Sequence, residues 1–78
     1  MINNYDFIFN YFVEREGAEI LSTLMDVDLI ESGLLDSLDM IELAVIIEKN
    51  TGIKVVLADS KTFNSMRRIQ SIIDMLEK

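Results

Sequence analysis

The sequence predicts an all-α fold, a small bundle of three to four helices in a single domain that spans residues 1–78. Half of the residues are apolar, only three are glycine and none is proline, which is a composition for a folded chain and not for a disordered one. Most apolar residues recur at spacings of three and four, as on helices. The single strand-like run, Ile53 to Ala58, has no second strand to pair with.

The first helix is expected to follow Asn3 or Asn4, because either side chain can accept a hydrogen bond from a free amide of the first turn. Asp6 lies in that first turn, where the helix dipole favours an anion. Arg15 stands near the end, and Gly17 is a suitable stop. The aromatic residues between them are expected to belong to the core.

A long loop is expected between the first and second helices. The spacing of Ile20, Leu21, Leu24 and Met25 predicts only a short helical turn. The segment 27–35 then carries large aliphatic residues around a glycine, which predicts a loop fixed to the core by its side chains. A loop of this length in a small domain is usually either functional or a sign that a secondary-structure element has been missed.

The second helix is the clearest element. Asp36 is the expected N-cap, the run from Leu38 to Ile47 favours a helix, and residues 50–52 (Asn-Thr-Gly) should end it. After the extended connection, one helical turn is expected near residues 57–61. The last helix is expected after a cap at Asn64 or Ser65, with its apolar face formed by Met66, Ile69, Ile72, Ile73 and Leu76.

Two apolar stripes run along the second helix, although a surface helix of a small domain needs only one for the core. The first stripe is Met40, Leu43, Ala44 and Ile47. The second is Leu38, Ile41 and Val45, with Asp39, Glu42 and Glu48 beside it. We expect this second stripe to bind a partner or an apolar ligand. The alternative is a helix that is buried on all sides.

Composition narrows the function. The chain has neither cysteine nor histidine, which removes thiol nucleophiles, zinc-thiolate sites and Ser-His-Asp chemistry, so an enzyme is not expected. The net charge is −7, and residues 16–48 contain nine acids and no base. Such a surface repels nucleic acid and anionic lipid and favours basic protein partners. No targeting signal or membrane-inserting segment is visible, which predicts a cytoplasmic protein.

Ser37 follows the expected cap, and by position alone it would be read as a capping residue. The segment from Gly33 to Leu43, GLLDSLDMIEL, closely resembles the phosphopantetheine-attachment motif of the acyl carrier protein family. The length, the long loop before the serine and the acidic second helix extend the resemblance over the whole chain. The stretch from Ile30 to Ser37 is also similar to D-alanyl and aminoacyl carrier proteins.

The resemblance implies an acyl-carrier-protein-like bundle that carries a covalent 4'-phosphopantetheine arm, derived from coenzyme A, on Ser37. It implies a monomer that shuttles acyl or aminoacyl groups as thioesters in fatty-acid, polyketide or related biosynthesis. The partners would be a phosphopantetheinyl transferase and loading and consuming enzymes with basic docking surfaces. Those enzymes would read Asp36, Leu38, Asp39, Ile41, Glu42 and Val45.

The sequence departs from the family after the second helix, where it has Thr51 and lacks the usual proline in the following connection. These departures leave the pathway and the cargo open. The alternative function is a small acidic adaptor that binds a basic partner without covalent modification, with Ser37 as a helix cap only. Covalent modification of Ser37 distinguishes the two.

Overall fold

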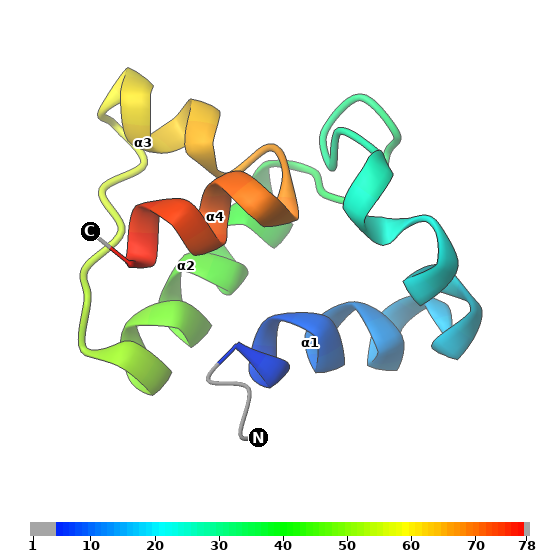
Figure 1. The fold of residues 1–78 in the computed structure, drawn as a ribbon. Helices are drawn as coiled ribbons and strands as arrows, with labels where there is room; N and C mark the ends of the chain where they lie inside the picture. The colour runs from blue at the N-terminus through cyan, green and yellow to red at the C-terminus, as the bar shows by residue number, and fades with distance from the viewer. Residues whose placement is uncertain (1–4, 78) are drawn as a thin grey trace.

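A computed structural model describes residues 5–77, which form an all-helical domain with no strand in that range. The three longer helices are α1 (Asp6–Glu16), α2 (Ser37–Thr51) and α4 (Ile69–Leu76), and α3 (Ser60–Ser65) is short. Two 3₁₀ helices, η1 (Ala18–Ser22) and η2 (Leu24–Asp26), follow α1. Figure 1 shows the segment after α1 passing around one side of the domain before it enters α2.

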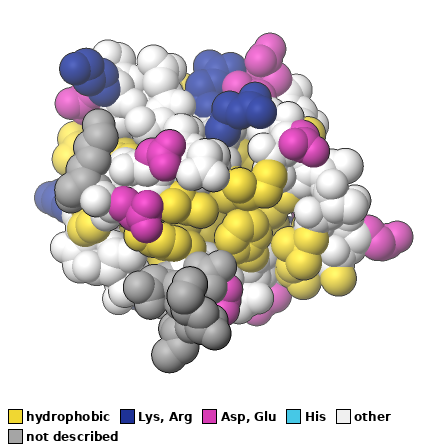
Figure 2. Space-filling view, viewed as in Figure 1, with side chains coloured by type: hydrophobic (Ala, Val, Ile, Leu, Met, Phe, Trp, Pro, Cys, Tyr) yellow, Lys and Arg dark blue, Asp and Glu magenta, His cyan; other side chains and the backbone are white. Residues whose placement is uncertain are grey.

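One core joins the helices. Ile8 and Phe12 of α1, Leu43 and Ile47 of α2, and Ile72 of α4 are all fully buried. Side chains from the irregular segments complete this core: Leu24, Leu29, Leu35 and Met66 are buried with them. A domain of this size cannot cover all its apolar surface. Accordingly, Figure 2 shows hydrophobic side chains reaching the surface across the middle of the face drawn there.

The first helix follows the sequence prediction where the structure describes it. Asp6 lies in the first turn, Arg15 in the last, and Gly17 caps the C-terminus at a φ of 92°. The predicted caps Asn3 and Asn4 lie outside the described residues. Tyr5 occupies the N-cap position and makes no side-chain capping bond. In the segment that follows, the single helical turn expected around Ile20 to Met25 is instead two 3₁₀ helices.

The prediction for α2 is confirmed. Asp36 is its N-cap, and Gly52 ends it in the left-handed conformation, at a φ of 76°, that glycine adopts without strain. The first apolar stripe faces the core: Met40, Leu43, Ala44 and Ile47 are buried. The second stripe faces outward, so the alternative of a helix buried on all sides is wrong.

The C-terminal part differs from the prediction. The expected turn near residues 57–61 lies later, as α3, because the Asp59 carboxylate accepts hydrogen bonds from the amides of Lys61 and Thr62 and starts the helix there. Asn64 and Ser65, the expected caps of the last helix, are therefore inside α3. The last helix begins instead at Ile69, after a bend that places Met66 in the core.

Within residues 5–77, none of the helices has the length and apolar character needed to cross a membrane. The longest of them, α2, has 15 residues. A helix needs about 20 apolar residues to span a bilayer.

Candidate functional site

The candidate site lies at the N-terminus of α2, where a capping box fixes the backbone. The Asp36 carboxylate accepts a hydrogen bond from the Asp39 amide at 2.9 Å. In return, the Asp39 carboxylate accepts one from the Asp36 amide at 3.2 Å. The two residues thus satisfy one another's amides, as in the S/T-x-x-E capping box, with aspartates in both positions.

Ser37 is the first residue of the helix and not its cap, so the interpretation of this serine as a plain cap is wrong. Its side chain is exposed, and no residue between 5 and 77 forms a hydrogen bond with its hydroxyl. The capping role is filled by Asp36, which leaves the Ser37 hydroxyl available to another molecule. A modifying enzyme can reach this hydroxyl, because it is exposed and has no hydrogen-bond partner in the first turn of the helix.

Hydrogen bonds at Asp28 and Leu29 fix the loop before Ser37. Asp28 accepts hydrogen bonds from the amides of Ile30 and Glu31, both at 2.9 Å, which closes a tight turn. The other oxygen of Asp28 receives a bond from Arg67 Nε at 2.8 Å. The Leu29 amide donates to the Arg67 carbonyl at 2.6 Å, so this loop is attached to the bend between α3 and α4.

A cleft of 370 Å³ opens beside Ser37. Its walls come from the preceding loop, from α2 and from α3, and are mostly apolar; they include Ile30, Gly33, Leu35, Asp36, Met40 and Phe63. Gly33 has a φ of 84°, so another residue at this position would strain the backbone of the cleft. The sequence predicts neither the cleft nor the place of Phe63 in its wall. The chain bends so that α3 lies close to Ser37, and no local sequence pattern indicates this bend.

The exposed stripe of α2 continues from Ser37 along the helix. Leu38, Ile41 and Val45 are 75%, 54% and 48% exposed, the first of them being the most exposed large apolar residue of the described chain. They are arranged at spacings of three and four, so they form one continuous face. Burying such a face against a partner is favourable, by about 25 cal/mol per Å².

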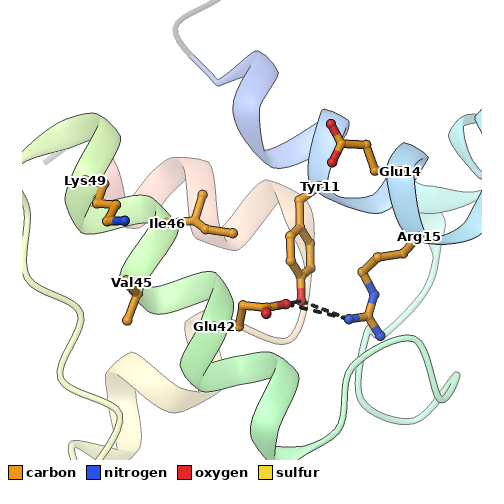
Figure 3. Close-up of a pocket in the computed structure, with 7 residues that line it drawn as sticks. All are labelled: Tyr11, Glu14, Arg15, Glu42, Val45, Ile46 and Lys49. Atoms are coloured by element: carbon orange, nitrogen blue, oxygen red, sulfur yellow. Dashed lines mark hydrogen bonds and ion pairs between the residues drawn. The ribbon is translucent and has the colours of Figure 1, made fainter.

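The acids expected beside this stripe are not equivalent. The two terminal guanidinium nitrogens of Arg15 on α1, Nη1 and Nη2, donate hydrogen bonds to the two carboxylate oxygens of Asp39, at 2.7 and 2.8 Å. Glu42 accepts a hydrogen bond from the Tyr11 hydroxyl at 2.8 Å, and Arg15 Nη1 donates to that hydroxyl at 3.2 Å. Figure 3 shows Tyr11 extending from α1 to Glu42 on α2 with the Arg15 guanidinium beside it. We call these four residues the α1–α2 network.

The network changes the proton affinities of its members. Burial, followed by the hydrogen bond to Glu42, raises the pKa of Tyr11 to about 12, so this hydroxyl stays protonated as a donor. The hydrogen bonds from Arg15 hold the pKa of Asp39 below its ordinary value. The sequence pattern does not predict this network. The available signal was that Arg15 is the single basic residue among the first 48.

Because of this network, the free energy of unfolding should depend on pH in the acidic range. Because the pKa of Asp39 is lower in the folded than in the unfolded state, its contribution is complete above about pH 4 and is lost as the pH falls through the folded value. In Asp39→Asn the free energy of unfolding should therefore fall less between pH 5 and pH 2 than in the wild type. The difference should be under about 1 kcal/mol, because the pair is open to solvent.

Urea titrations of both proteins across that pH range measure this difference. Asp28 also has a lowered pKa, first because of the hydrogen bond from the Glu31 amide, so part of the acid sensitivity must remain in the variant. Parallel curves for the two proteins would contradict the role assigned to Arg15.

The larger hollow of the surface lies elsewhere. A groove of 640 Å³ runs between α1 and α2 and is lined by Tyr11, Glu14, Arg15, Glu42, Val45, Ile46 and Lys49. It borders the exposed stripe at Val45 (Figure 3), and Ser37 is not among the residues that line it. Within residues 5–77, no cluster of three or more acidic side chains is placed to hold a metal ion.

Comparison of this chain with family models, with curated proteins and with solved structures found no match.

Proposed function

We propose that the protein is a carrier that bears a 4'-phosphopantetheine arm on Ser37 and takes acyl or aminoacyl groups between partner enzymes. The observation that supports this most directly is the Ser37 hydroxyl. It is exposed and without a hydrogen-bond partner in the described chain, because Asp36 caps the helix in its place. The resemblance of residues 33–43 to the attachment motif selects the same serine.

The attachment step uses Ser37 as a nucleophile. The Ser37 oxygen attacks the pantetheine-side phosphorus of coenzyme A, and a phosphodiester bond forms while the bond within the pyrophosphate breaks. Adenosine 3',5'-bisphosphate leaves, and the hydroxyl proton passes to a base of the transferase. The terminal thiol of the arm supplies the sulfur that this cysteine-free chain lacks.

The surroundings of Ser37 fit such a modification. The rigid turn from Asp28 and the capping box at Asp36 hold the backbone on both sides, so an enzyme meets the serine in one conformation. The apolar cleft beside it offers a surface for the arm. The exposed stripe of Leu38, Ile41 and Val45 offers a docking surface for apolar side chains of the transferase and of later enzymes.

Intact-mass measurement tests the proposal. Incubation with coenzyme A, Mg²⁺ and a broad-specificity phosphopantetheinyl transferase should add about 340 Da to the wild type and nothing to Ser37→Ala. Ser60→Ala is the matched control, because Ser60 is also exposed and also follows a capping aspartate at the start of a helix. This variant should be labelled as fully as the wild type.

The opposite result has a defined meaning. If the folded wild type gains no mass, even with a transferase from its own source, the covalent carrier is excluded. The adaptor that binds a basic partner without modification then becomes the function to test. Labelling that persists in Ser37→Ala would place the modification on another residue.

A further inference from the structure

The acids of α2 are divided between two edges of the exposed stripe. Successive residues of an α-helix are rotated by about 100°. Asp39 is therefore about 160° from Ser37, on the side of the helix that faces α1. Glu48, eleven residues after Ser37, returns to within about 20° of it and lies about 16 Å along the axis. Ser37 and Glu48 thus share one edge, and Ile41 lies beside this edge.

The edge that faces α1 is internally neutralised. Both oxygens of Asp39 are bound by Arg15, and the Asp39 side chain is only 19% exposed. Glu42 is occupied by the Tyr11 hydroxyl and lies 3.8 Å from Arg15. Lys49 and Glu14 also line the groove on this side, so they add one cation and one acid to it. A cation of a partner would have to displace Arg15 in order to pair with Asp39.

The edge with Ser37 has the opposite character. Glu48 is exposed, and no ion pair or hydrogen bond of its side chain occurs in the described part of the chain. Its carboxylate is therefore available to a cation that approaches over Ile41. A partner that reaches Ser37 from this direction meets an unpaired acid, whereas on the α1 side Asp39 is already bound by Arg15 and Glu42 already accepts the Tyr11 hydroxyl.

We propose that Arg15 makes the docking face one-sided: by binding Asp39 it removes this acid from recognition, and partners read Glu48 instead. The face then fits an enzyme that presents apolar side chains to Leu38, Ile41 and Val45 and basic groups to the Ser37–Glu48 edge. Basic groups that lie over α1 would have to compete with Arg15 for Asp39. Asp39 is in this view a residue of the fold, and not one that a partner contacts.

This inference rests on the proposed function, because the transferase is the first partner that must read the face. The test compares two double variants, each of which removes one cation and one anion and so keeps the net charge at −7. They are Arg15→Gln/Asp39→Asn and Glu48→Gln/Lys49→Gln. The asparagine at position 39 keeps a side-chain oxygen for the Asp36 amide, and circular dichroism checks that both proteins are folded.

The measurement is kcat/KM for labelling of Ser37 by the transferase at low and at moderate salt. We expect Arg15→Gln/Asp39→Asn to stay within about twofold of the wild type and Glu48→Gln/Lys49→Gln to be slower by about fivefold, less so at higher salt. Slow labelling of the folded first variant, or unchanged labelling of the second, overturns the inference alone. A wild type that is not labelled at all overturns the proposed function and the inference together.

Discussion

Replacing Phe12 with alanine should remove a large share of the free energy of unfolding. Phe12 is fully buried in the core, and its ring packs edge-on against Tyr11 with the centroids 5.3 Å apart. Truncating a buried phenylalanine costs about 3–5 kcal/mol, because apolar contact is lost and a cavity remains. A chain of this size has roughly 4–10 kcal/mol of stability in total. The substitution therefore removes a large share of this stability.

Urea titration followed by far-UV circular dichroism measures this effect. Phe63→Ala is the matched control, because Phe63 is 37% exposed at the rim of the cleft and its removal leaves the core filled. The control should lose about 1 kcal/mol. If the two variants unfold at the same urea concentration, the core described for α1, α2 and α4 is wrong.

Replacing Leu38 with glutamine should produce the converse result, a large loss of labelling in a protein of unchanged stability. Leu38 is the most exposed large apolar residue of the described chain and directly follows the proposed attachment serine. Glutamine has a similar helix propensity, so α2 should be unaffected. If Leu38 is a principal anchor of the docking surface, its replacement should cost about 1.4 kcal/mol or more, which corresponds to at least about a tenfold loss in kcat/KM for the transferase.

Leu21→Gln is the control for this experiment. Leu21 is also an exposed leucine, but it lies in η1, away from α2. Its replacement should leave kcat/KM for labelling unchanged. If Leu38→Gln is labelled as fast as the wild type, or if Leu21→Gln is slowed equally, then the exposed stripe of α2 is not the docking surface.

The sequence predicts α2 well because every signal for that helix is local. The capping aspartate, the two apolar stripes and the final glycine all lie within residues 36–52; Asp36 caps the helix, Gly52 ends it, and one stripe faces the core while the other is exposed. The end of α1 at Gly17 and the insertion of Leu29 and Leu35 into the core follow from the same kind of pattern. These elements place Ser37 at an exposed helix start without any reference to the rest of the chain.

The rest of the fold depends on contacts between distant residues. Asn64 and Ser65 have good capping side chains. However, the helix that Asp59 caps begins at Ser60 and already includes both residues. The pairing of Arg15 with Asp39 joins residues 24 positions apart, and no spacing rule connects them. As a result, the sequence assigns Asp39 to a partner surface, whereas the structure binds it to α1.

The bond between Asp28 and Arg67 has a consequence for the newly made chain. It joins residues 39 positions apart, and the whole of α2 lies between them. When Ser37 emerges from the ribosome, Arg67 is still enclosed within it, so the turn before the serine lacks one of its two anchors. A transferase that requires this turn in its final form would act only after the last helix has been made and has packed. Modification at Ser37 would then follow the packing of α4 and not precede it.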